Sequence, residues 1–155
     1  MSDLKKIEIY PIGFVKRVSN DEDVKDRSLL SEIVLKKGLT KSLNGIEEWS
    51  HVYIIFWMHA VAGTERVLLH HPSQERIDSS PVGIFATRTS VRPNPIGLTL
   101  VELVKRKKNI LWVRGLDAAN NTPILDIKPY PDWERGRWLV VADFRVPEWL
   151  AKINR

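Results

Sequence analysis

Apolar and polar residues alternate along most of this chain, in runs too short for long helices. The run 7–18 alternates and is interrupted by Pro11 and Gly13, which predicts a strand with a bend or bulge. The stretch 51–60, "HVYIIFWMHA", is β-branched and aromatic throughout, which predicts a central strand buried on both faces. Alternation of this kind, with a period of two residues, is typical of β-sheet proteins.

The same pattern predicts further elements on both sides of the central strand. A helical turn is expected at 45–49, with Asn44 as its N-cap. Short strands are predicted at 31–39, 65–72 and 81–88, the last of which runs into a proline turn. A hairpin is predicted with strands Leu98–Val104 and Ile110–Leu116 around 105–109. A strand at 122–130 ended by Pro129, a last strand at 137–146 and a terminal helix at 147–155 follow.

Roughly six to eight short strands with frequent turns predict an all-β, barrel-like fold. Long amphipathic helices between the strands are missing from the pattern, which argues against a Rossmann fold. The length of 155 residues fits one domain, so we expect a single β-barrel domain over residues 1–155. No apolar run approaches the roughly 18 residues of a membrane span, and the N-terminus does not resemble a signal peptide, so a cytoplasmic protein without membrane contact is expected.

Composition narrows the chemistry. The formal net charge of +5 suits a polyanionic partner such as nucleic acid, and it equally suits a merely basic surface. The chain has no cysteine, and His70 and His71 are adjacent, so we expect no metal site. Ser79 and Ser80 have no evident base beside them, which speaks against a serine nucleophile. The stretch 105–108, "KRKK", is expected to be a hydrated hairpin tip or a phosphate contact.

The stretch 83–98, "GIFATRTSVRPNPIGL", predicts a rigid, polar loop. Pro93 and Pro95 restrict the backbone around Asn94, which favours a binding surface over a simple connector. Arg88 and Arg92 offer planar guanidinium groups for a carboxylate or phosphate. We expect one of the two arginines to bind loop carbonyls instead.

Three other places combine polar side chains with a constrained backbone. Asp126 and Lys128 share one face of the strand at 122–130, just before Tyr130. They form either a solvated ion pair or the acceptor and cation of a site with a stacking ring. The stretch 114–117, "RGLD", is explained by turn chemistry or by ligand binding, and His59 by a satisfied core position or by ligand binding.

Taken together, "FATR", "RPNPIGL" and "LDIKPY", with "GIEEWSHVYIIFWMH" and "IGFVKRV", resemble the TsaA-like family. Its characterised members are S-adenosylmethionine-dependent tRNA methyltransferases (tRNA methyltransferase O). The resemblance covers most of the chain, from about Ile12 to Tyr130, although the turn before "TP" reads Asn120-Asn121 where the family usually has Asp-Gly. It implies a small β-barrel methyltransferase that works as a homodimer and methylates N6 of threonylcarbamoyladenosine beside the tRNA anticodon.

The resemblance also implies which residues form the site. The cofactor side would consist of His59, Arg88, Leu98, Arg114, Gly115, Leu116 and Asp117, and the reaction side of Arg92, Pro93, Asn94, Pro95, Asp126, Lys128, Pro129 and Tyr130. An arginine suits the carboxylate of S-adenosylmethionine, Asp117 its ammonium group or ribose, and Leu98 its adenine. Asp126 is the candidate base, with Lys128 or Tyr130 holding that base or the carbamoyl oxygen.

Two alternatives of different classes stay open at this point. The first is a non-catalytic β-barrel that holds nucleic acid or a nucleotide. The second is a methyltransferase of the same scaffold that acts on a small molecule. Methyl incorporation into tRNA, and its sensitivity to RNase treatment of the substrate, would separate the three functions.

Overall fold

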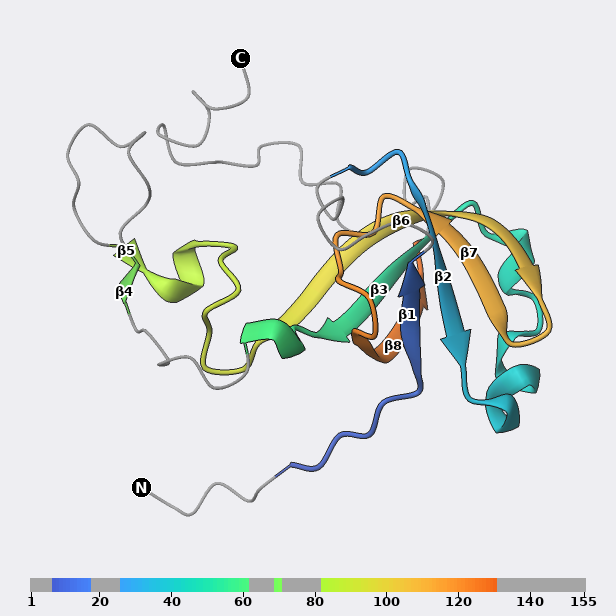
Figure 1. Cartoon of the computed structure of the whole chain (residues 1–155), viewed down its shortest axis with the longest axis horizontal. Helices are drawn as coiled ribbons and strands as arrows, with labels where there is room; N and C mark the ends of the chain where they lie inside the picture. Colours follow the sequence, from blue (N-terminus) through green and yellow to red (C-terminus); the bar gives the residue numbers. More distant parts are fainter. Residues whose placement is uncertain (1–6, 18–25, 62–68, 71–81, 131–155) are drawn as a thin grey trace, which may run out of the picture. The chain divides into compact units, whose positions relative to one another are not determined.

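The structure is a computed structural model of the whole chain, and it describes residues 7–17, 26–61, 69–70 and 82–130 (Figure 1). The chain divides into two compact units, residues 1–62 with 95–130 and residues 63–94 with 131–155. A single domain over residues 1–155 stays a prediction. No helix in the described part of the chain is long and apolar enough to cross a membrane.

A closed β-barrel forms the first unit (Figure 1). Its strands follow the order β1-β2-β7-β6-β3-β8, and all neighbouring pairs are antiparallel. Their bounds are β1 Gly13–Arg17, β2 Leu30–Leu35, β3 His51–Trp57, β6 Ile96–Lys107, β7 Ile110–Arg114 and β8 Pro123–Pro129. The all-β, barrel-like fold predicted from the alternation is confirmed, and closure gives each of these strands a neighbour on both sides.

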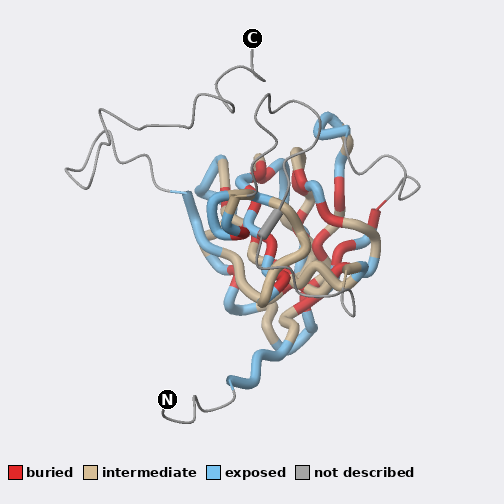
Figure 2. The backbone as a smooth tube through the Cα atoms, turned by 90° about the vertical axis from the view of Figure 1, so that its left-hand side faces the viewer, coloured by how far each residue is buried: buried red, intermediate tan, exposed pale blue. Residues whose placement is uncertain are grey.

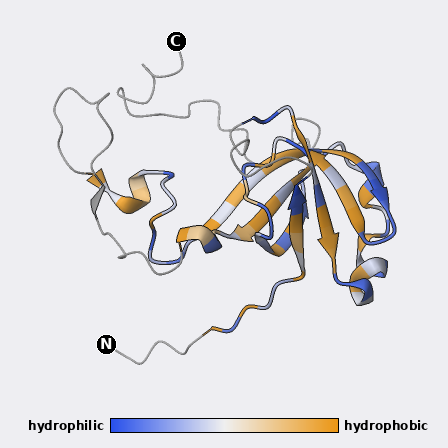
Figure 3. Ribbon diagram, viewed as in Figure 1, coloured by the Kyte–Doolittle hydropathy of each residue, from blue (hydrophilic) through white to orange (hydrophobic). Residues whose placement is uncertain are grey.

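Inward-facing side chains from every strand make the barrel core. On β3 these are Val52, Ile54 and Phe56, each buried, while the residues between them are half-exposed. Figure 2 shows buried positions recurring along the barrel strands, and Figure 3 shows the apolar colour concentrated on those strands. The prediction that β3 is buried on both faces was therefore wrong. Its outward residues Tyr53, Ile55 and Trp57 are aromatic or aliphatic, but they lie on the outside of a small barrel.

The first predicted strand is shorter than its alternation suggested. β1 begins at Gly13, and residues 7–12 are not in a strand, with Ile7 and Tyr10 exposed by 82% and 71%. Pro11 has no N–H to donate to a ladder, so the chain before it cannot continue regular pairing. Gly13 itself lies close to β2, since a Cβ there would come within 2.5 Å of the Val34 carbonyl oxygen. The predicted strand end at Val18 lies outside the described residues.

The β6–β7 hairpin is tighter than predicted. β6 continues to Lys107, and its register with β7 leaves Lys108 and Asn109 as the connection, with Lys108 at a positive φ of 56°. The register also shifts at Val104, which is a β-bulge. The expected hydrated tip over 105–108 is wrong for Arg106, whose side chain is only 14% exposed.

Short 3-10 turns complete the first unit: η2 Lys37–Leu43, η3 Ile46–Glu48 and η4 His59–Val61. The helical turn predicted at 45–49 is present, but Asn44 is not its N-cap. Gly45 occupies that position with φ of 84°, and Asn44 ends η2. A positive φ suits glycine, which explains why the capping role moved by one residue.

The second unit is described over short stretches only. β4 (Leu69–His70) pairs with β5 (Val82–Gly83), and η5 (Ile84–Ala86) follows with Ile84 buried. The predicted strand at 81–88 is thus a short strand followed by a turn. The strand predicted at 137–146 and the helix at 147–155 lie outside the described residues, as do Ser79, Ser80 and His71.

Candidate functional site

The outer face of β6, β3 and β8 brings the main candidates together. In the register of the barrel, Leu98 lies opposite Ile55, and Ile55 lies opposite Asp126. One row further along, Leu100 lies opposite Tyr53, and Tyr53 opposite Lys128. Two strand spacings separate Leu98 from Asp126, which is roughly 10 Å between backbones. An apolar side chain proposed for the cofactor and a carboxylate proposed for the reaction thus share one surface.

A β-bulge directs Asp126 to that surface. β3 pairs Phe56 with Ile124 and Ile55 with Asp126, so Leu125 is the extra residue. Ile124 is completely buried in the core. In a regular strand Asp126 would point to the same side as Ile124, because side chains repeat every two residues. The bulge lets a core residue and an outward carboxylate stand only two positions apart.

Asp126 and Lys128 form an ion pair, with 2.7 Å between Asp126 Oδ2 and Lys128 Nζ. The Ile127 backbone N–H donates to the other carboxylate oxygen at 2.8 Å. Both side chains of the pair stay exposed, by 47% for Asp126 and 62% for Lys128. The Tyr130 ring packs edge-on against Tyr53, with 5.5 Å between ring centroids. Of the two alternatives for Asp126 and Lys128, the structure shows the solvated ion pair, and a role of this exposed pair in a site stays a prediction.

The segment 114–117 runs on from β7 beside β6. The Arg114 guanidinium binds the Glu102 carboxylate of β6 at 2.7 Å. Gly115 has a φ of +94°, which confirms the expected positive φ at this position. Asp117 accepts a hydrogen bond from the Thr99 hydroxyl, next to Leu98 in β6. The segment therefore contacts β6 beside Leu98, but through Thr99, which is buried and points to the opposite face of the strand.

Two members of this segment differ in what they can offer a ligand. The Leu116 side chain is buried in the core, so this residue can contribute only backbone groups. Asp117 is exposed and also lies 3.3 Å from Arg27 Nη2, a side chain that precedes β2. A carboxylate flanked by an arginine and a hydroxyl can accept hydrogen bonds from an ammonium group or a diol.

His59 lies where η4 follows β3. It is half-buried, and its Nδ1 is 3.4 Å from the hydroxyl oxygen of buried Thr122, just before β8. The backbone of neighbouring Met58 donates to Pro95 at 2.8 Å, at the start of β6. His59 thus has one partner within the protein and is partly accessible, which lies between the two predictions of a satisfied core position and a ligand-binding residue.

Arg88, Arg92 and Asn94 belong to the second unit. Arg92 donates through Nη1 to the carbonyl oxygens of Thr87 at 2.8 Å and Thr89 at 3.3 Å. Its guanidinium also lies 6.0 Å from the ring centroid of Phe85, which is 79% exposed. The expectation that one arginine binds loop carbonyls is confirmed for Arg92. Arg88 and Asn94 are exposed, and a pocket shared with the barrel residues stays a prediction.

Sequence reasoning missed several residues of this region. Ile55 and Tyr53 connect the two halves of the outer face, and their alternation with buried Val52, Ile54 and Phe56 was a usable signal. Thr99 and Arg27, which hold Asp117, come from distant segments and carried no local signal. Among the described residues no group of three or more histidines or carboxylates gathers as a metal site would require.

Comparison with known proteins shows which family this chain resembles. Residues 22–133 match the family model of the tRNA-methyltransferase O N-terminal domain. A protein of Methanothermobacter thermautotrophicus, named "Probable S-adenosyl-L-methionine-binding protein", is 38% identical over 136 residues, which is 84% of this chain and 93% of that protein. A mouse tRNA (adenine(37)-N6)-methyltransferase is 37% identical over 113 residues, which is 73% of this chain.

A solved structure supports the same relationship. The crystal structure of TrmO from Pseudomonas aeruginosa matches with a TM-score of 0.68 and 28% identity over 92% of this chain. This chain spans 62% of that structure's chain and 23% of the mouse protein. The similarity therefore covers 92% of this chain for the crystal structure and 73% for the mouse protein, but only part of these two larger proteins.

Proposed function

The chain belongs to the tRNA-methyltransferase O N-terminal domain family, and from this premise we propose that it is an S-adenosylmethionine-dependent tRNA methyltransferase. Its target would be N6 of an adenosine beside the anticodon, in the threonylcarbamoyl form. The names of the archaeal and mouse relatives support the cofactor and the class of substrate. The single observation that carries the proposal is the shared outer face of Leu98 and Asp126 on either side of β3.

Leu98 on this face and the segment 114–117 beside β6 fit the chemical groups of S-adenosylmethionine. Leu98 is 48% exposed, so an adenine ring can cover apolar surface there. Asp117 presents a carboxylate for the ammonium group or the ribose, and Gly115 a backbone without a side chain. His59 and Arg88 would complete the cofactor side, with Arg114 keeping the segment in place through Glu102. The bound cofactor supplies the methyl group on a sulfonium.

The reaction side would consist of Asp126, Lys128 and Tyr130, with Arg92 and Asn94 of the rigid turn. The N6 nitrogen must lose its proton when it gains the methyl group, and Asp126 Oδ2 would accept that proton. Lys128, 2.7 Å away, would hold the carboxylate in place and balance its charge. Rigid alignment of the reacting groups can lower the barrier by roughly 7–11 kcal/mol, which explains a need for proline-restricted loops.

We also propose that the protein works as a homodimer. Ile96, Leu98 and Leu100 are exposed by 39%, 48% and 40% on one face of β6, an apolar strip that a second copy of the chain would cover. Light scattering across a range of protein concentrations would measure the assembly, and a monomer at every concentration would contradict the proposal.

The decisive experiment combines labelled S-adenosylmethionine with total tRNA. The wild type should transfer methyl groups, and Asp126→Asn should transfer them about 10²–10⁴-fold more slowly. Glu48→Gln is the matched control, since it also replaces an exposed carboxylate by an amide and should retain full activity. Calorimetry should show the same cofactor affinity for all three proteins. Saturable tRNA binding without any methyl incorporation by the wild type would reject the proposed enzyme.

A further inference from the structure

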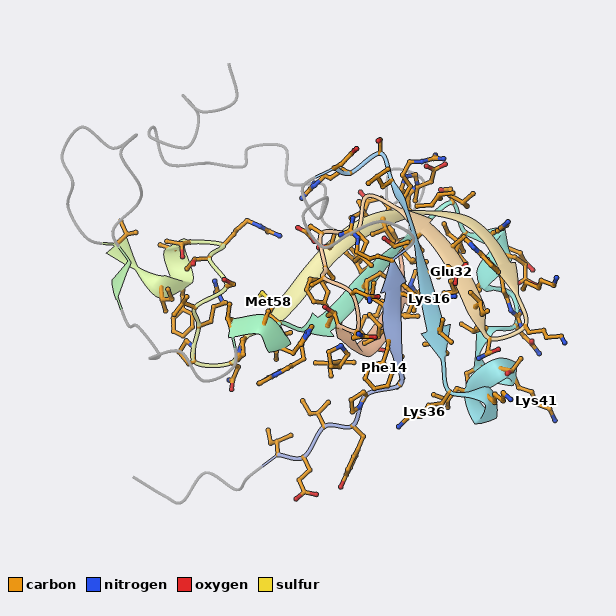
Figure 4. All side chains as sticks on the ribbon, viewed as in Figure 1. Phe14, Lys16, Glu32, Lys36, Lys41 and Met58 are labelled. Atoms are coloured by element: carbon orange, nitrogen blue, oxygen red, sulfur yellow. The ribbon has the colours of Figure 1, made fainter. Side chains whose placement is uncertain are left out.

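One end of the barrel carries a group of exposed lysines that the proposed site does not use. They come from two segments far apart in the sequence, 36–41 ("KKGLTK") and 105–108 ("KRKK"). We call this group the lysine end: Lys36, Lys37, Lys41, Lys105, Lys107 and Lys108, all exposed. Figure 4 shows Lys36 and Lys41 pointing away from the barrel on different sides of η2, so the charge is spread around the end.

Direct contacts hold the two segments together. Arg106 lies between lysines of the hairpin, and its guanidinium donates to the carbonyl oxygens of Thr40 at 3.1 Å and Leu43 at 2.9 Å. The Leu35 backbone N–H donates to the Asn109 carbonyl oxygen at 2.9 Å. The lysines therefore project from two segments whose backbones are held together by hydrogen bonds.

Few described carboxylates lie close to the positive charges of the lysine end. The acidic residues in its two segments and the turn that follows are Glu47 and Glu48. Glu47 is already bound by Arg106, at 3.1 Å. No described acidic residue lies within ion-pair distance of Lys37, Lys41 or Lys107. A cluster of cations that outnumbers its local carboxylates attracts a polyanion.

We infer that the lysine end binds the phosphate backbone of RNA. It would thus give a bound tRNA a second contact, separate from the reactive face. This rests on the proposed function for the identity of the RNA. Lys105 lies 4.6 Å above the centroid of the Trp112 ring, so a flat apolar surface adjoins the cations, as in proteins that bind nucleic acid through backbone and bases. A lipid surface fits less well, because the one apolar residue within the two segments, Leu39, is half-buried.

The test is the salt dependence of binding to total tRNA. Each phosphate contact adds about 0.7–0.9 to the slope of log affinity against log salt concentration. The triple variant Lys37→Gln, Lys41→Gln, Lys107→Gln should therefore lower the slope by about two. Lys107→Gln and Lys16→Gln each remove one exposed lysine from a barrel strand, and Lys16 is the control because it lies outside the lysine end and pairs with Glu32 at 3.4 Å. Lys107→Gln should lower the slope by somewhat less than one, and Lys16→Gln should leave it unchanged.

Two further measurements separate this inference from the proposed function. Cofactor affinity by calorimetry should be equal in wild type and triple variant, since no lysine of this end belongs to the proposed cofactor site. Methyl transfer by the wild type with unchanged tRNA affinity and slope in the triple variant would overturn the inference and keep the function. Lost tRNA affinity in the triple variant, with no methyl transfer by the wild type, would support the inference and reject the function. Reduced binding to phosphatidylserine vesicles with tRNA binding retained would also overturn it.

Discussion

Arg106 and Asp126 both follow a β-bulge, yet their side chains reach very different environments. The bulge at Val104 places Arg106 in register with buried Leu111, on the inward side of the barrel. The bulge at Leu125 places Asp126 in register with Ile55, on the outward side. One extra residue in a strand thus sends one charged group toward the core and another toward solvent.

The protein satisfies these two charges to different degrees. Arg106 donates to the carbonyls of Thr40 and Leu43, to Asn44 Oδ1 and to the Glu47 carboxylate. Asp126 has one cation and one backbone N–H, and half of its side chain is exposed. A fully satisfied, buried guanidinium stabilises the fold, whereas an exposed pair contributes little to stability and keeps its capacity to bind something else.

Replacing Arg106 by alanine should have the largest effect on stability. The substitution leaves two carbonyls and the Asn44 amide oxygen without their donor in a partly buried place, which costs about 2–4 kcal/mol. Urea unfolding measures this as a lower midpoint. Lys107→Ala, one residue away and exposed, is the control and should change stability by less than about 0.5 kcal/mol. Equal midpoints for the two variants would remove the structural role of Arg106.

Gly97→Ala should have the next largest effect, through the strands that carry the proposed site. Gly97 lies opposite Phe56 in the register of β6 and β3, and an added Cβ would overlap the Phe56 ring. Because Phe56 is only 5% exposed, its ring has little room to move, and we expect a loss of about 1–3 kcal/mol. Gly38→Ala, where a Cβ meets open space, should be nearly neutral. A neutral result for Gly97→Ala would mean that the core beside the site repacks freely.

The sequence allowed prediction of much of the barrel and of one edge of the site. The alternation of β6 and the end of β8 at Pro129 follow local rules of side-chain period and proline chemistry. The same-face pairing of Asp126 with Lys128 followed from the strand period alone.

The sequence did not allow prediction of either bulge. In "ILDIKP" both Ile124 and Ile127 face the core, and nothing local says that Leu125 is the extra residue. The partners of Arg106 lie about sixty positions away, so the "KRKK" stretch gave no sign that its arginine is partly buried. Such features depend on which segments meet in three dimensions, and single-strand patterns do not contain that information.

Lys128→Ala gives the sharpest contrast with Arg106→Ala. Both remove a cation that binds a carboxylate, but the Lys128 pair is exposed, so the loss of stability should stay within about 1 kcal/mol. Under the proposed function, methyl transfer should nevertheless fall about a hundredfold, because Asp126 loses the group that positions it. Lys128→Arg should restore part of the activity. Full activity in Lys128→Ala would make the Asp126–Lys128 pair a surface ion pair without a role in the reaction.

The smallest expected effect is on stability at acidic pH, and it concerns Glu47, the carboxylate that Arg106 binds. A hydrogen bond from its own backbone N–H, together with the Arg106 guanidinium, lowers the pKa of Glu47 below its ordinary value of 4.5. A carboxyl group with a lowered pKa in the folded state stabilises the protein above its unfolded pKa, and this contribution is lost as the pH falls through the folded pKa. Glu47→Gln should therefore slightly flatten the decline of the unfolding midpoint below about pH 4.5. An unchanged acid limb in Glu47→Gln would mean that Arg106 draws its stabilising effect from the neutral carbonyls and the Asn44 amide oxygen alone.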